Sequence, residues 1–236
     1  MFGSTRCALV LCIATVIAGP SLGDAKGNAI LKEAFTKYGA AKTMTAAITI
    51  NQKDPRTGAP ITLKGTVVAM KPNYLRMEVS LGENAQSFVA DGKQYFSYVS
   101  AGSVKAYRKE PDQAKPVEYQ GIWEGEIDSF FGGAASAAKY DAMLTGSEKV
   151  GGVECDLVKV EMKVPERTAV YAIGKLDKLI HRASLTIPVQ GGAQQSQTNL
   201  LSDIKFNVAK TPADFVFKIP PGAKEVPAPK PPVISI

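Results

Sequence analysis

The chain has 236 residues, of which 45% are hydrophobic, and it carries a net charge of +6. This size and composition allow one well-buried domain and lie within the range of single all-β domains. The positive charge is spread along the chain, without a run of basic residues or basic residues interleaved with aromatic ones, which argues against a nucleic-acid-binding protein.

The first residues have the pattern of a signal peptide. A short segment with one positive charge, Arg6, precedes an apolar run at residues 7–19, which is too short for a comfortable membrane span. Pro20 ends the run, and Ser21 and Gly23 put small residues at the positions that a signal peptidase reads. We therefore expect residues 1–23 to be removed near Gly23 and the protein to be exported. An uncleaved membrane anchor is the alternative.

The cysteines bear on both anchoring and folding. Cys12 follows the large residue Leu11, whereas a lipidation site needs a small residue there, so we expect a soluble protein without a lipid anchor. Two of the three cysteines lie in the leader, which leaves Cys155 alone. The exported protein then has no intramolecular disulfide, and its fold must rest on its apolar core.

After the leader, the spacing of the apolar residues changes from helical to strand-like. Residues 29–38 have an apolar stripe at helical spacing that stops at Gly39, which predicts an amphipathic helix. Alternation of apolar and polar residues predicts the strands that follow, with a turn at Pro72 and a hairpin turn at Asp91-Gly92. We place these strands at residues 46–50, 63–70, 74–81, 88–90 and 94–99.

The middle of the chain, residues 121–138, lacks alternation and predicts one or two short helices joined at Gly132-Gly133. Alternation then returns and predicts strands at 158–162, 168–173, 179–187, 200–208 and 215–219, with a polar loop at 191–197. We expect about nine or ten strands in one domain, residues 24–226, followed by a proline-rich tail at 227–236.

Few residues offer catalytic chemistry. His181 is the only histidine, and it lies in a predicted strand; the acidic neighbours of Cys155 do not favour a reactive thiol. No Gly-x-Ser-x-Gly turn is present, and one histidine with one cysteine cannot form the usual transition-metal sites. Glu124, Glu126 and Asp128 are interpreted as a solvated helix face and not as paired catalytic carboxylates. We expect a protein that is not an enzyme and that holds no cofactor and no metal.

Three stretches in the same order resemble the LolA-like family, the periplasmic carriers of outer-membrane lipoproteins. They are VVAMKPNYLRM at 67–77, FVADGKQYFSY at 88–98 and FVFKIPPGAKEV at 215–226. The resemblance implies a mainly β (α+β) fold: a strongly curved antiparallel sheet that forms an incomplete barrel, covered by an N-terminal helix and short central helices. It also implies a periplasmic protein that binds the acyl chains of lipoproteins or lipids, as a monomer, with membrane-bound donor and acceptor proteins as possible partners.

The alternation assigns residues to the groove that the resemblance implies, although the same residues would also suit an ordinary core. The groove candidates are Leu75, Met77, Val79, Phe88, Phe96, Tyr98, Val160, Met162, Leu185 and Phe206. The candidates for a lid over the groove are Ile122, Trp123, Ile127, Phe130 and Phe131.

One residue departs from the family pattern. The carriers have an arginine just before the turn proline, which helps to hold the lid, whereas this chain has Lys71. A lysine does not reproduce the forked hydrogen bonding of arginine. The alternative function is therefore an envelope-sensing or regulatory module with the same fold, which binds another protein.

Overall fold

The computed structural model describes residues 24–53, 57–110, 124–163, 166–188 and 194–227. These residues form two α-helices, α1 (Ala25–Ala40) and α2 (Glu124–Ala137), and a short 3₁₀ helix η1 (Pro212–Phe215). The strands are β1 (Thr43–Lys53), β2 (Pro60–Met70), β3 (Tyr74–Leu81), β4 (Asn84–Asp91), β5 (Tyr95–Ala101), β6 (Val104–Glu110), β7 (Asp141–Val150), β8 (Val153–Lys163), β9 (Glu166–Gly174), β10 (Ile180–Pro188), β11 (Gln194–Phe206) and β12 (Lys224–Glu225).

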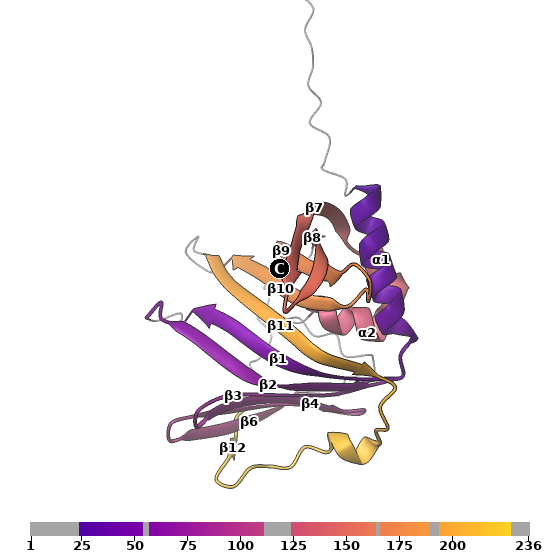
Figure 1. Cartoon of the computed structure of the whole chain (residues 1–236). Coiled ribbons are helices and arrows are strands. Elements are labelled where there is room, and N and C mark those ends of the chain that lie inside the picture. The colour runs from indigo at the N-terminus through magenta and orange to yellow at the C-terminus, as the bar shows by residue number, and fades with distance from the viewer. Residues whose placement is uncertain (1–23, 54–56, 111–123, 164–165, 189–193, 228–236) are drawn as a thin grey trace, which may run out of the picture.

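All twelve strands of the described chain belong to one sheet, in the order β12-β6-β5-β4-β3-β2-β1-β11-β10-β9-β8-β7. Neighbouring strands are antiparallel, except for the two-residue strand β12, which runs parallel to β6. The sheet bends into two arms, with β2–β6 in one and β7–β10 in the other, and it does not close into a barrel (Figure 1). The predicted mainly β, incomplete antiparallel barrel is confirmed.

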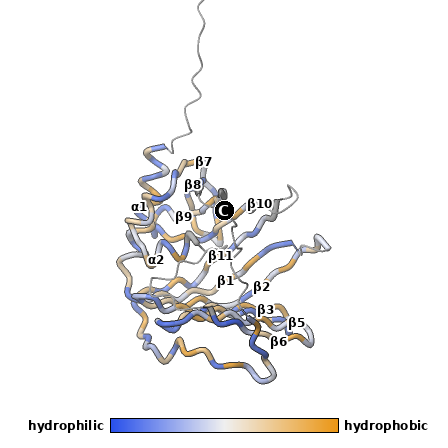
Figure 2. The backbone as a smooth tube through the Cα atoms, turned by 180° about the vertical axis from the view of Figure 1, so that it is seen from behind, coloured by the Kyte–Doolittle hydropathy of each residue, from blue (hydrophilic) through white to orange (hydrophobic). Residues whose placement is uncertain are grey.

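The two arms meet where β11 pairs with β1. Ile50 lies opposite Asn199 in this pair, and Ile50 also lies opposite Leu63 of β2. Residues that face each other in antiparallel strands project to the same side of the sheet. The register therefore defines an inner face, the side that α1 and α2 cover, and an outer face. Hydrophobic and hydrophilic residues follow one another along the strands, as expected for a sheet with one buried face (Figure 2).

Helix α1 packs the apolar stripe predicted from the sequence against the inner face: Leu31, Ala34, Phe35 and Tyr38 are all buried. Its start is fixed by Asp24, whose carboxylate accepts hydrogen bonds from the backbone N–H of Gly27 (2.5 Å) and of Leu144 in β7 (2.8 Å). An N-cap that also bonds a strand stabilises the helix and sets its position on the sheet.

Helix α2 bends at Gly133, which has a φ of 56° and separates two helical segments. The prediction of one or two short helices with a joint at Gly132-Gly133 is confirmed for residues 124–137. The helix lies against α1 so closely that a Cβ placed on Gly39 would lie 2.5 Å from the Cα of Gly133. Two glycines at this crossing therefore allow the helix backbones to touch.

Three expectations about strands were wrong. Residues 215–219 form no strand; instead Arg76 donates to the carbonyls of Asp214 and Val216, both at 2.8 Å, and holds this segment across the outer face. Residues 212–226 are called the C-terminal strap below. Residues 194–197, which were expected in a polar loop, belong to β11. Strands β6 and β7 were missed, since polar residues outnumber apolar ones in both.

The glycine crossing of α1 and α2 gives a stability prediction. Gly39→Ala puts a methyl group within 2.5 Å of a backbone carbon, so the helices must separate. Overpacking of this kind costs about 1–3 kcal/mol, which exceeds the roughly 1 kcal/mol that alanine gains over glycine in a helix. We expect a lower melting temperature for Gly39→Ala, and no loss for Thr36→Ala on the exposed side of α1. Equal stability of Gly39→Ala and the wild type would contradict the close crossing.

Candidate ligand-binding groove

An apolar layer lies between the inner face of the sheet and α2, and we call it the groove. Its floor comes from β1, β2, β3 and β11, and α2 covers it beside Tyr38 of α1. The lining residues are Tyr38, Met44, Ala46, Val67, Ala69, Leu75, Met77, Glu126, Ile127, Phe130, Phe131, Leu201 and Ile204.

The side chains of α2 fill the groove in this structure. Ile127 and Phe130 are buried, and Phe130 packs edge-to-face on Phe131 at 4.9 Å between ring centroids. The cavity left among the lining residues is about 20 Å³. This volume holds about one water molecule. An acyl chain can enter only if α2 moves.

The sequence prediction places several groove residues on the correct face. Leu75 and Met77 line the groove, and Val79, Val160 and Leu185 are buried on the inner face. Two further candidates, Phe88 and Phe206, are partly buried and pack against this core. The three lid candidates in the described chain, Ile127, Phe130 and Phe131, all line the groove. Ile122 and Trp123 lie outside the described residues, as does the side chain of Met162.

Phe96 and Tyr98 were wrongly assigned to the groove. In the β4–β5 hairpin, Phe88 of the inner face lies opposite Ser97, whereas Phe96 lies opposite Val89. The turn between Asp91 and Gln94 sets this register, and a shift of one residue moves every side chain to the other face. Phe96 therefore lies on the outer face, where its ring stacks on Phe217 of the strap at 4.8 Å.

Lys71 holds α1 and α2 together at the edge of the groove. Its ammonium group donates to the carbonyl of Gly39 at the end of α1, and it lies 5.3 Å from the centroid of the Phe130 ring. Burial lowers the pKa of this lysine. The lysine therefore combines one hydrogen bond with a cation–π contact to the lid.

Glu126 is a carboxyl group in the apolar layer. Its residue is 4% exposed, and Oε1 accepts a hydrogen bond from the side-chain amide of Asn199 at 3.3 Å. Asn199 in turn accepts a bond from the side-chain amide of Gln197 at 2.6 Å. The other oxygen, Oε2, is buried without a hydrogen-bond partner in the described part of the chain. Glu126, Gln197 and Asn199 are called the polar cluster below.

This burial contradicts the interpretation of the three acids as a solvated helix face. The first turn of α2 is directed toward the sheet, so Glu126 is buried, while Asp128 is partly exposed and accepts a bond from the Tyr140 hydroxyl at 2.7 Å. Desolvation raises the pKa of the Glu126 carboxyl to about 7. A group that changes charge near neutral pH thus lies between the lid and the sheet.

The sequence reasoning missed Gln197 and Asn199, because it placed Gln197 in a loop and searched the strands for apolar residues only. Extending the two-residue period backward from Leu201 would have found both, since they occupy positions i−2 and i−4 on the same face.

A second cavity of about 720 Å³ lies on the outer face, between β2–β5 and the strap. Its lining is mixed, with Lys64, Arg76 and Glu78 beside Tyr98 and Phe217. The exposed apolar side chains of Val216 and Ile219 belong to the same strap. This cavity is open and has a mixed lining, in contrast to the closed, apolar groove.

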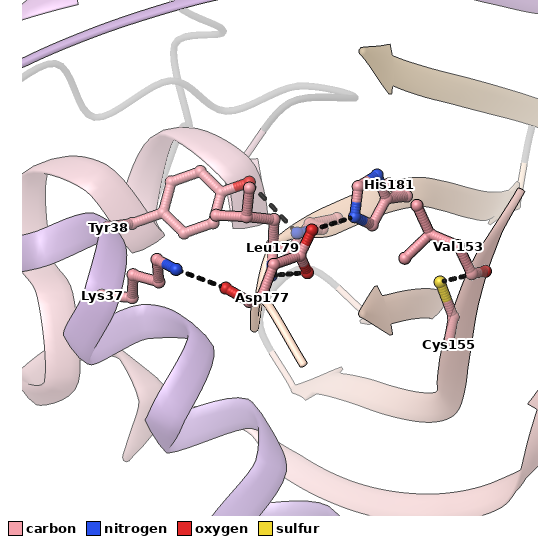
Figure 3. Close-up of polar contacts among 8 residues, drawn as sticks. Lys37, Tyr38, Val153, Cys155, Asp177, Leu179 and His181 are labelled. Atoms are coloured by element: carbon pink, nitrogen blue, oxygen red, sulfur yellow. Dashed lines mark hydrogen bonds and ion pairs between the residues drawn. The ribbon is translucent and has the colours of Figure 1, made fainter. Parts of the chain in front are cut away.

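The histidine and the cysteine have structural contacts (Figure 3). His181 Nε2 lies 2.9 Å from Asp177 Oδ2, and the Asp177 carbonyl accepts a bond from Lys37 of α1 at 2.6 Å. The Cys155 thiol is buried and donates to the Val153 carbonyl at 3.4 Å. Burial raises the pKa of this thiol, which disfavours the nucleophilic thiolate. Within the described ranges no three acidic, histidine or cysteine side chains gather as metal ligands would.

No protein-family model matches the sequence, and no curated protein matches it either. Solved structures resemble the fold. A LolA superfamily protein from Nitrosomonas europaea matches with 13% identity and a TM-score of 0.42, over 81% of this chain and 97% of its own. The lipoprotein LppX of Mycobacterium tuberculosis matches with 14% identity and a TM-score of 0.46, over 79% and 99%.

MucB of Pseudomonas aeruginosa, in its complex with MucA, matches with 12% identity and a TM-score of 0.43, over 82% of this chain and 62% of the matched chain. These likenesses concern the fold alone. In the described part of the chain, no helix has the length and apolar character needed to cross a membrane.

Burial of Glu126 predicts a pH-dependent stability. Its pKa is raised from an ordinary 4.5 to about 7, so the folded protein binds this proton more tightly than the unfolded chain does. The resulting stabilisation is complete below pH 4.5 and is lost as the pH rises through 7. Glu126→Gln stays neutral, so we expect it to be about 3 kcal/mol more stable than the wild type at pH 8 and equally stable at pH 4.

Urea unfolding of both proteins across this pH range measures the difference. Glu83→Gln, which changes an exposed carboxylate, is the control and should follow the wild type at every pH. Parallel profiles for the wild type and Glu126→Gln would contradict the buried position of the carboxyl group.

Proposed function

We propose that this protein is an exported, periplasmic binding protein for the acyl chains of lipoproteins or lipids, which it holds in the groove. The observation that carries the proposal is the way the inner face is covered. The apolar floor of β1, β2, β3 and β11 is covered by a short, bent helix, and that helix contributes only a few apolar side chains. Such a cover can be replaced by another apolar group of similar size.

The free energy lost when the side chains of α2 leave the groove is comparable to the free energy gained when an acyl chain enters it. Burying a large apolar side chain is worth about 1.5–3 kcal/mol, so withdrawing Ile127, Phe130 and Phe131 costs about 5–9 kcal/mol. Each methylene buried returns about 0.8 kcal/mol, so roughly ten methylenes offset the loss. The proposal therefore favours long acyl chains over short ones.

The lid is the part of the cover that is suited to move. Helix α2 has a bend at Gly133. The Glu126 oxygen that has no partner in the described chain makes the closed arrangement less favourable than a fully apolar contact. Helix α1, in contrast, is tied to β7 through Asp24 and to β10 through Tyr38, whose hydroxyl accepts a bond from the Ile180 N–H at 3.1 Å. We infer binding without catalysis, by a monomer that exchanges its ligand with membrane-bound donor and acceptor proteins.

A regulatory module that binds another protein is the second candidate. The observation that favours it is the outer cavity, with the exposed side chains of Val216 (50%) and Ile219 (57%) beside it. A partner protein would use this face, whereas an acyl chain would use the groove. The two candidate functions thus predict that substitutions on opposite faces of the sheet weaken binding: on the inner face for an acyl chain, and on the outer face for a partner protein.

A matched pair of substitutions tests the proposal. Ile204→Asp puts a charge on a partly buried residue of the groove, and Val216→Asp puts the same charge on the outer strap. We expect Ile204→Asp to weaken binding of a fluorescent long-chain fatty acid at least tenfold, because a carboxylate is poorly solvated beside the chain. Val216→Asp should bind like the wild type, with circular dichroism confirming that both variants fold.

Native mass spectrometry of the protein from its own periplasm, followed by lipid extraction, identifies the natural ligand. An empty wild-type protein that takes up neither the fluorescent fatty acid nor a neutral long-chain acyl lipid would refute the carrier and leave the protein-binding module.

The contacts of Lys71 give a second prediction for this function, which concerns the stability of the closed lid. Lys71→Met removes the bond to Gly39 and the cation beside Phe130, so the closed lid loses stabilisation that acyl binding must otherwise overcome. We expect the fatty acid to bind about fivefold more tightly to Lys71→Met, which corresponds to about 1 kcal/mol. Lys71→Arg keeps a cation at this place and should stay close to the wild type. Weaker binding by Lys71→Met would show that this lysine supports the ligand and not the closed lid.

A further inference from the structure

The polar cluster has no evident structural purpose in the groove. Gln197 and Asn199 project from the inner face: Gln197 lies opposite Leu185 and Gln52, and Asn199 lies opposite the apolar residues Ala183 and Ile50. Both are buried, at 2% and 0% exposure. Burying an amide or a carboxyl group among apolar side chains is unfavourable unless every polar atom is paired, and Glu126 Oε2 is not paired within the described residues.

We propose that Glu126, Gln197 and Asn199 form a subsite for the neutral polar head of the bound acyl ligand, a hydroxyl or amide group next to the chain. The inference rests on the proposed function and specifies which acyl ligands the groove selects. Glu126 lines the apolar layer that the chain would enter, together with Met77 and Phe130, and its Oε2 has no hydrogen-bond partner among the described residues.

The hydrogen-bonding capacity of the cluster fits such a head. Glu126 Oε2 is an open acceptor, which a ligand O–H or N–H can satisfy. The side-chain amide of Gln197 has a second N–H beside the one that Asn199 accepts, which can donate to a ligand oxygen, and Asn199 holds the carboxyl group in place through Oε1. A hydroxyl or an amide provides both a donor and an acceptor, whereas a fatty-acid carboxylate provides acceptors only and repels the ionised Glu126.

The surrounding charges do not compensate for an anionic head. In the described chain the cation beside the groove is Lys71, and its ammonium group is already engaged by the Gly39 carbonyl and the Phe130 ring. Tyr38, which faces Glu126 from α1, is kept neutral by a pKa that burial raises far above its ordinary value. The site therefore selects neutral heads that carry a donor, such as an amide-linked acyl chain or the hydroxyl groups of a monoacylglycerol, over free fatty acids.

The position of the cluster allows selection during lid movement. Gln197 and Asn199 lie on β11, a central strand of the sheet that is paired on both sides, so they stay in place when α2 shifts. Glu126 lies on α2 and brings its carboxyl group to the ligand head when the lid settles on the chain. A ligand that satisfies Oε2 then stabilises the lid over the chain.

Competition binding with two probes of equal chain length tests the inference. At pH 8, where Glu126 is ionised, 1-monomyristoylglycerol and myristate compete with the fluorescent fatty acid for the wild type and for Glu126→Leu and Asn199→Leu. Hydrogen bonds to charged groups are worth about tenfold or more in affinity, so we expect the preference for the monoglyceride to fall about tenfold in each variant. The ratio of the two affinities is compared between each variant and the wild type. This comparison removes the contribution of the difference in hydrophobicity between the probes.

Asp128→Asn is the control, because it changes a carboxylate on the same helix that lies outside the groove lining. It should keep the preference of the wild type. An unchanged preference in both Glu126→Leu and Asn199→Leu would overturn the subsite while leaving acyl binding intact. Failure of the wild type to bind either probe would overturn the proposed function itself.

Discussion

The arrangement of this protein depends on how an unclosed sheet buries its apolar inner face. Closing the barrel would bury that face within the sheet, but β7 and β12 remain separate ends of one twelve-stranded sheet. The face must therefore be covered by other elements, and α1 and α2 cover it. Helix α1 is fixed by hydrogen bonds to the sheet through Asp24 and Tyr38. Helix α2 covers the groove mainly by packing, with Lys71 and Asn199 as its polar contacts.

Fixed and exchangeable covers have different consequences for function. A cover held mainly by packing can be displaced by an apolar ligand of similar size, since the hydrophobic effect is non-directional. Specificity for a particular ligand must then come from polar groups, and the polar cluster beside the groove supplies such groups. Glu126, Gln197 and Asn199 make the closed state less favourable and at the same time provide the directional contacts that a bare apolar face lacks.

Much of the fold could be predicted from the sequence because each strand with one buried face alternates clearly. Residues 74–81 and the Asp91-Gly92 turn are examples, and the helical spacing of Ile127, Phe130 and Phe131 predicted the lid residues. Strands β6 and β7 lie toward the ends of the sheet and carry many polar residues, so they have no such pattern.

The errors at the site have two physical causes. Phe96 and Tyr98 were assigned to the groove from the alternation along the strand, but the length of the hairpin turn sets the register and places them on the outer face. Glu126 was expected in solvent, because an acidic residue in the first turn of a helix is usually exposed. Its burial follows from how α2 docks on the sheet, and no local pattern in the sequence encodes that docking.

Hydrogen exchange measured by mass spectrometry, with and without a long-chain acyl ligand, tests most directly whether α2 is an exchangeable cover. We expect ligand binding to change the exchange of residues 124–131, as the lid leaves its closed position, while β1, β2 and β11 keep their protection. If the ligand binds and α2 exchanges as before, or if only the strap at 212–226 responds, then the groove is an ordinary core and the ligand lies on the outer face.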